Sequence, residues 1–138
     1  MATEVRILIA IDTNVAARFL MRDDTVQTAI ADNVIGYQAF FISHGVLMEL
    51  GWVLRSAAGW NRVEINQAIR LLLSLPGANV ELPGLINWAL EQHLAGGDWA
   101  DMLHLVANRR SDAFHTFDTA IEGAAGNKAP VPVKTLGE

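Results

Sequence analysis

The sequence contains no cysteine. This absence excludes disulfide bonds, thiol nucleophiles and thiolate zinc sites. Any metal ion must therefore be held by oxygen or histidine ligands. The histidines show no metal-ligand spacing, and we expect structural or surface roles for most of them; they are His44, His93, His104 and His115.

Long apolar runs are also absent. Unbroken apolar stretches such as Ile7 to Ile11 are far shorter than the roughly 18 residues that span a bilayer. The N-terminal segment carries an acid at Glu4 and has neither a basic region nor a small-residue cleavage site, so it does not resemble a secretory signal. We therefore expect a cytoplasmic protein without a membrane-spanning segment.

Basic residues are scarce, and the net charge is −5. This balance argues against nucleic acid as a partner, because binding depends largely on Lys and Arg neutralising phosphates. However, eight of the ten basic residues are arginine, whose planar guanidinium suits phosphate. Acids gathered to hold cations would also lower the net charge, so charge alone does not decide the partner.

Hydrophobic residues make up 51% of the 138 positions, which predicts one globular domain over residues 1–138. Apolar patterning predicts strands over 5–11, 39–43, 80–82, 113–117 and 131–136. Helical spacing and capping signals predict helices over 15–21, 25–37, 45–58, 61–75, 85–95 and from 98 onward. The order β-α-α-β-α-α-β-α-α-β-β indicates an α/β fold with a mainly parallel central sheet of four to five strands. The first strand is apolar throughout, as is typical of a strand covered on both faces.

Four acidic residues stand at positions where an active site could form. Asp12 and Asp118 each follow a predicted strand, and sites in open parallel sheets lie beyond the carboxyl ends of the strands. Glu49 and Asp101 flank apolar helical stripes. Four carboxylates in one crevice would repel by up to about 4 kcal/mol per pair at 4 Å. Mg²⁺ or Mn²⁺, which prefer oxygen ligands, would offset that repulsion.

Each acid also has a purely structural explanation. Asp12 could form an Asx-turn at the end of its strand, and Asp101 could interact with the helix dipole. Glu49 could be a solvated helix residue, and Asp118 could cap the segment that follows it. Spacing alone leaves both interpretations open.

Three segments add a resemblance to a known family. The segments IAIDTNVAARFLMRDD, ISHGVLMELGWVLRS and GGDWADMLHLVANRRSDAFHTFDTAI resemble, in order and separation, the signature blocks of PIN-domain ribonucleases of the VapC toxin type. The resemblance covers essentially the whole chain. It implies a PIN-like fold in which Asp12, Glu49, Asp101 and Asp118 are the catalytic acids.

The same resemblance assigns secondary positions. Asn14 and Thr116 match polar positions that line the family's site. Asp98 caps a helix, binds metal through water, or does both. Glu122 is a weak candidate for a fifth acid, because the segment TAIEG departs from many relatives.

The activity implied is hydrolysis of RNA by an endoribonuclease that requires Mg²⁺ or Mn²⁺. Asp12, Asp101 and Asp118 would hold the metal, and Glu49 would complete the cluster. A bound metal ion lowers the pKa of water and stabilises charge on phosphate, so no side-chain nucleophile is needed. The implied partners are an RNA substrate, with tRNA as one candidate, a VapB-type antitoxin that silences the toxin, and a second copy in a homodimer.

Several alternatives remain open. The chain could be a housekeeping PIN nuclease rather than a toxin, or a catalytically silent PIN binding module, although all four family acids are present. A haloacid-dehalogenase-like phosphatase would need an aspartate where this chain has Asn14. A response-regulator receiver would need paired acids beside its first strand. Four of the aromatic residues could anchor an interface or fill the core; they are Phe19, Trp52, Trp60 and Trp88. Arginines that could contact phosphate, or equally be solvated, are Arg18, Arg22, Arg55, Arg109 and Arg110.

Overall fold

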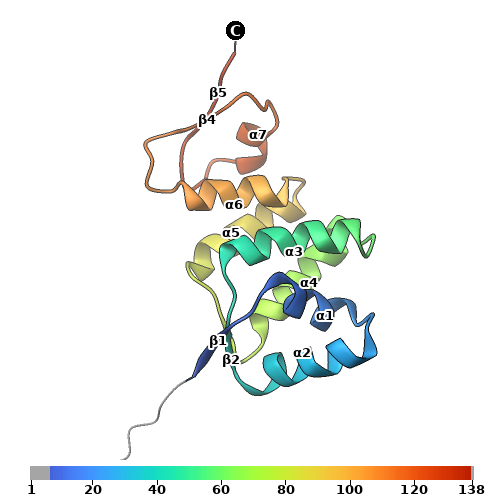
Figure 1. The fold of residues 1–138 in the computed structure, drawn as a ribbon. Helices are drawn as coiled ribbons and strands as arrows, with labels where there is room; N and C mark the ends of the chain where they lie inside the picture. The colour runs from blue at the N-terminus through green and yellow to red at the C-terminus, as the bar shows by residue number, and fades with distance from the viewer. Residues whose placement is uncertain (1–6, 138) are drawn as a thin grey trace, which may run out of the picture. The chain divides into compact units, whose positions relative to one another are not determined.

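The computed structural model describes residues 7–137 and has an α/β fold with parallel strands (Figure 1). The chain divides into two compact units, the first ending at Glu81 and the second beginning at Leu82. Residues 4–6, which include Glu4 and the start of the first predicted strand, lie outside the described residues. The first unit contains β1 (Leu8–Ala10), α1 (Thr13–Met21), α2 (Thr25–Tyr37), β2 (Ala39–Phe41), α3 (His44–Ser56), α4 (Arg62–Ser74) and β3 (Ala78–Asn79). The second contains α5 (Pro83–Leu94), α6 (Trp99–Ala107), β4 (Phe114–Thr116), α7 (Ile121–Ala125) and β5 (Val133–Thr135).

The sheet of the first unit has the order β1-β2-β3, and both pairings are parallel. The third strand lies at 78–79 rather than at the predicted 80–82. Pairing begins directly after the turn, because the Phe40 N–H donates to the Gly77 carbonyl at 2.8 Å. A Cβ at Gly77 would lie 2.5 Å from the Gln38 carbonyl oxygen. Glycine is therefore required for this close approach of β3 to β2.

Within the described part of the first unit, strand β1 is the edge of the sheet and is not covered on both faces, contrary to the prediction from its apolar sequence. Ile7 is 65% exposed, Leu8 52% and Ile9 37%, whereas Phe40 in the neighbouring strand is fully buried. The continuous apolar sequence therefore predicted the position of the strand correctly, but its prediction that both faces of the strand are buried is wrong.

Capping residues set the helix boundaries of the first unit. Asp12 caps α1, so the helix begins two residues before the predicted Val15. Asp24 caps α2 through the Gln27 N–H. Asn61 and Glu64 form the predicted capping box at the start of α4. Each cap satisfies backbone N–H groups that the first turn of a helix leaves unpaired.

The core of the first unit is formed by the apolar faces of its helices and by β2. Small residues Ala16, Ala17 and Ala31 are buried on α1 and α2, where they let the two helices approach closely. On α3 the predicted apolar stripe buries Leu47, Leu50 and Leu54. Other buried apolar residues of this unit are Ile11, Ile35, Phe40, Ile42, Ile65, Ile69 and Leu72.

The second unit packs α5 against α6 and contains the parallel pair β4-β5. The sequence predicted two successive strands here without an intervening helix, which is wrong, because α7 lies between them. A parallel pair needs a crossover connection, unlike a hairpin. The Gln92 side-chain amide donates to the Ala125 carbonyl at 2.8 Å and fastens α7 to α5. The buried apolar residues of this unit include Ile86, Ala89, Leu90, Met102, Leu103, Leu105 and Val106.

The four aromatic residues singled out from the sequence differ in exposure. Trp52 on α3 is mostly exposed, so a core role for it is wrong. Phe19, Trp60 and Trp88 are partly buried. Within residues 7–137, no helix is long and apolar enough to cross a membrane.

Candidate active site

Asp12 stands at the junction of β1 and α1. The preceding Ile11 N–H donates to the Phe41 carbonyl at 3.0 Å, which extends the pairing of β1 with β2 up to this point. The Asp12 Oδ1 accepts the Val15 N–H at 3.0 Å and caps α1. The side chain is exposed, and its other oxygen accepts no hydrogen bond from the described residues. Asp12 thus has a structural role, but this role is an N-cap rather than the predicted Asx-turn. One carboxylate oxygen is still available for another role.

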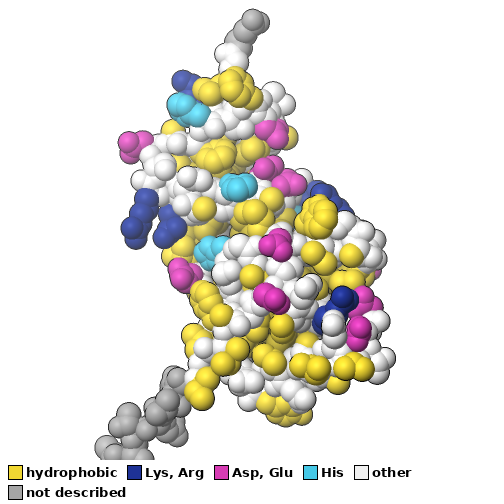
Figure 2. Space-filling view, in the orientation of Figure 1, with side chains coloured by type: hydrophobic (Ala, Val, Ile, Leu, Met, Phe, Trp, Pro, Cys, Tyr) yellow, Lys and Arg dark blue, Asp and Glu magenta, His cyan; other side chains and the backbone are white. Residues whose placement is uncertain are grey.

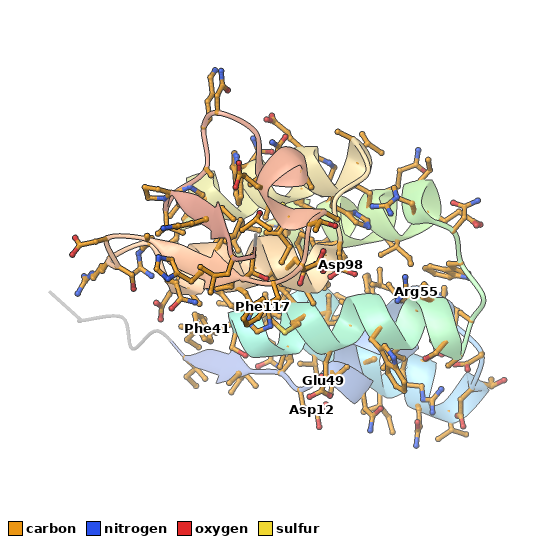
Figure 3. All side chains as sticks on the ribbon, turned by 90° about the horizontal axis from the view of Figure 1, so that it is seen from above. Asp12, Phe41, Glu49, Arg55, Asp98 and Phe117 are labelled. Carbon is orange, nitrogen blue, oxygen red and sulfur yellow. The ribbon has the colours of Figure 1, made fainter. Side chains whose placement is uncertain are left out.

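Glu49 is held near Asp12 by a hydrogen bond to Thr13, a residue that the sequence did not single out. The buried Thr13 hydroxyl donates a hydrogen bond of 3.1 Å to the Glu49 Oε2. This bond joins the first turn of α1 to α3, and Figure 3 shows the side chains of Asp12 and Glu49 near each other at the meeting of these helices. The only sequence signal for Thr13 was its place between two polar candidates.

Asn14 is exposed on the first turn of α1. Together with Asp12 it lines a pocket of about 250 Å³ between α1 and α2. The other lining residues are Val15, Arg18, Gln27, Ile30, Ala31 and Val34. A candidate acid and a candidate polar residue thus border one cavity within the first unit.

The second unit holds the other acids. Asp98 caps α6 by accepting the Asp101 N–H at 2.9 Å, so its predicted capping role is confirmed. The Asp118 N–H donates to the Thr116 hydroxyl at 3.0 Å, and its Oδ1 accepts the Ala120 N–H at 2.8 Å. Asp118 therefore forms a turn and does not cap α7, whose N-cap residue is Ala120.

The pKa of the Asp101 carboxyl depends on two other acids of this unit. Burial raises the pKa of the Asp101 carboxyl, and the negative charges of Asp98 and then Asp118 raise it further, while His104 acts in the opposite direction. Asp98 and Asp101 lie on one helix turn, whereas Asp118 follows β4. The fold of this unit thus brings an acid distant in sequence within electrostatic range of Asp101.

Glu122 has a structural partner of its own. Its Oε1 accepts hydrogen bonds from both the backbone N–H and the hydroxyl of Thr135, each at 3.2 Å. The side chain thereby fastens α7 to β5. This use accounts for Glu122 without an active-site role.

The candidate acids offer carboxylate oxygens, the donor type that Mg²⁺ and Mn²⁺ prefer. The negative charges of Asp98 and Asp118 near Asp101 are also of the sign that a cation would neutralise. Among residues 7–137, however, no three His, Asp or Glu side chains are arranged so that they could hold a metal ion. Metal binding by Asp12, Asp101 and Asp118 stays a prediction.

Arginine side chains differ in their availability. Arg18 pairs with Asp23 at 2.9 Å and Arg22 pairs with Asp32 at 2.8 Å, so these two are neutralised locally. Arg55 and Arg110 are exposed. Within each unit, on the face shown in Figure 2, Lys and Arg side chains form separate small groups.

Comparison of this chain with protein-family models, with curated proteins and with solved structures gives no match.

Proposed function

We propose that this chain is a metal-dependent endoribonuclease, a single PIN-like domain of the VapC toxin type. Asp12, Glu49, Asp101 and Asp118 are its catalytic acids in this proposal, with Asn14, Thr116 and Asp98 in supporting roles. The three sequence segments that resemble the PIN family support it. So does the fold class, which is α/β with parallel strands.

One observation carries the proposal furthest, the raised pKa of Asp101. Two of its causes are the charges of Asp98 and Asp118, one of them on a different element. Asp98 lies near Asp101 because it caps the same helix, but the capping of α6 does not require Asp118, which follows β4, to lie within range of Asp101. Acids that act on phosphate do need to lie within range of one another, because a cation held among them offsets both their own repulsion and the charge of the substrate.

The local contacts define what the protein's own groups contribute. Thr13 holds the Glu49 carboxylate next to the start of α1. The Asp12 and Asp118 carboxylates are each oriented by a backbone N–H, which leaves oxygen lone pairs unused. Mg²⁺ or Mn²⁺, when bound by the acids, would supply a water of lowered pKa and stabilise negative charge on phosphate.

The finer architecture belongs to the same proposal. A PIN-like domain has one central parallel sheet of four to five strands. The free edge and exposed apolar residues of β1 support such a sheet, because an edge of this kind favours pairing with a further strand. A VapB-type antitoxin, a homodimer and a cytoplasmic location are likewise part of the proposal, and follow from the resemblance alone.

The testing experiment is cleavage of a structured RNA, such as tRNA, by the purified chain with added Mg²⁺ or Mn²⁺. We expect internal cuts that EDTA abolishes and that an excess of Mn²⁺ restores. Equal cleavage in excess EDTA would show that the metal mechanism is wrong. Release of phosphate from small phosphomonoesters, without any endonuclease activity, would favour a phosphatase instead.

A further inference from the structure

The pocket between α1 and α2 lies directly beside Asp12 and has a lining of mixed character. We propose that this pocket receives a nucleobase of the RNA strand next to the cut, and that Gln27 selects bases presenting a carbonyl oxygen. The inference rests on the proposed function for its substrate class. Its geometry lies wholly within the first unit.

The volume and the aliphatic lining of the pocket suit a single nucleobase. Its volume is about 250 Å³, and Val15, Ile30, Ala31 and Val34 line it with aliphatic groups. Proteins that take single bases into pockets hold the ring faces between apolar or aromatic side chains and contact the base edge with hydrogen bonds. The remaining lining residues are polar, and they supply such contacts.

The orientation of the Gln27 amide is fixed by its neighbour. The Arg18 Nε donates to the Gln27 Oε1 at 2.7 Å, while the Arg18 Nη1 is held by both carboxylate oxygens of Asp23 at 2.9 and 3.0 Å. Arginine can only donate hydrogen bonds. The amide oxygen of Gln27 must therefore face Arg18, and its NH₂ group is left as a donor without a partner among residues 7–137.

A fixed donor discriminates between bases. It complements a carbonyl oxygen, such as that of uracil or guanine, and opposes the exocyclic amino group that cytosine or adenine carries in the same place. The Asn14 side chain forms no hydrogen bond with the described residues, so its amide can rotate to serve a second polar atom of the base. Asp12 at the pocket border places the bound nucleotide next to a proposed catalytic acid.

A hydrophobic side chain from a protein partner is the competing occupant. The apolar wall would suit it, but the unpaired amides of Asn14 and Gln27 would then be covered without hydrogen bonds. Covering polar groups in this way is costly. A base satisfies both the apolar wall and the amides, and the lining therefore favours RNA.

The test does not require cleavage. The full chain is titrated with UMP, GMP, CMP and AMP in separate experiments, and backbone amide shifts of α1 and α2 are followed by NMR. We expect UMP and GMP to shift the signals of Val15, Ala31 and Val34, and to bind roughly tenfold more tightly than CMP and AMP, the effect of about one hydrogen bond. Gln27→Glu keeps an oxygen for Arg18 and removes the donor, so it should abolish that preference.

A matched pair of variants tests the location. Ile30→Glu and Val26→Glu each add one negative charge to α2 at an exposed position, with exposures of 59% and 69%. Only Ile30 lines the pocket. We expect Ile30→Glu to weaken nucleotide binding at least fivefold and Val26→Glu to change it less than twofold. Equal weakening by both would show a general charge effect and overturn the pocket.

Other outcomes separate this inference from the proposed function. RNA cleavage without nucleotide shifts on α1 and α2 would overturn the base pocket alone. Nucleotide shifts at these residues without any RNA cleavage would support the pocket and contradict the nuclease. If N-acetyl-leucinamide shifted the same signals more strongly than every nucleotide, the pocket would belong to a protein partner and the inference would be wrong.

Discussion

The Thr13 hydroxyl and the Glu49 carboxylate, 36 positions apart in the chain, are joined by a hydrogen bond of 3.1 Å. Thr13→Val replaces the hydroxyl by a methyl group of similar size and removes only this bond. We expect a loss of unfolding free energy of about 1 kcal/mol. Because Glu49 would then be held less firmly, RNA cleavage should fall less in this variant than in Glu49→Gln. Denaturant unfolding and cleavage rates on the same samples measure both effects, and an equal or larger loss of activity in Thr13→Val would contradict this positioning role.

Substitution of Asp12 or Asp118 by asparagine should separate catalysis from capping. Asparagine caps helices and turns nearly as well as aspartate, so the unfolding free energy without metal should change by less than about 0.5 kcal/mol. Cleavage of RNA should nevertheless be lost, because the amide carries no charge. Full activity in either variant would remove that residue from the site.

Metal binding should appear as a thermal shift in the parent protein. A ligand that binds only the folded state stabilises it by mass action, so Mg²⁺ or Mn²⁺ should raise Tm. Asp12→Asn and Asp118→Asn should lose much of that gain. The measurement is thermal unfolding across a metal titration, and an unchanged response in both variants would contradict a shared metal site.

Asp101→Asn should stabilise the metal-free protein above acidic pH. The pKa of Asp101 is raised in the folded state. Below the ordinary aspartate pKa the group is protonated in both states and contributes nothing. As the pH rises through the raised pKa, the charged form disfavours the folded state, and the parent loses stability that the variant keeps. We expect a gain of only a few tenths of a kcal/mol at neutral pH, because the side chain is partly exposed and its charge is screened.

This pH dependence is checked by denaturant unfolding of parent and variant between pH 3 and pH 7. The difference should be small at the acidic end and should grow toward neutrality. Asp112→Asn, at an exposed position with no part in the candidate site, is the matched control. A stability difference that does not vary with pH would contradict the assigned cause.

Glu122→Gln tests whether the fifth acid is structural. Its hydrogen bonds to Thr135 can be accepted by the amide oxygen of glutamine, so this variant should be nearly as stable as the parent and fully active. Glu122→Ala removes both bonds and should cost about 1 kcal/mol with RNA cleavage retained. Loss of cleavage in Glu122→Gln, measured on folded protein, would restore Glu122 to the site.

The elements that sequence predicted well are those with local signals. Asn61 with Glu64, and Asp98 before α6, are caps that depend only on near neighbours. The displacement of β3 to 78–79 and the presence of α7 depend on pairing with distant strands, which no local pattern encodes. The candidate site divides in the same way. Position after a strand indicated Asp12 and Asp118, whereas Thr13 and Gln27 matter through partners that only the fold supplies.

The exposed edge of β1 also bears on how the protein behaves at high concentration. Its free edge and its exposed apolar residues Leu8 and Ile9, with Ile7 just before the strand, have the features of a strand that templates aggregation. In the proposed central sheet a further strand covers this edge, so self-association through β1 should begin on heating, when that pairing opens. Leu8→Lys places a charge on the edge and should delay the onset of light scattering on heating, whereas Leu71→Lys, at an equally exposed apolar position on α4, should delay it less.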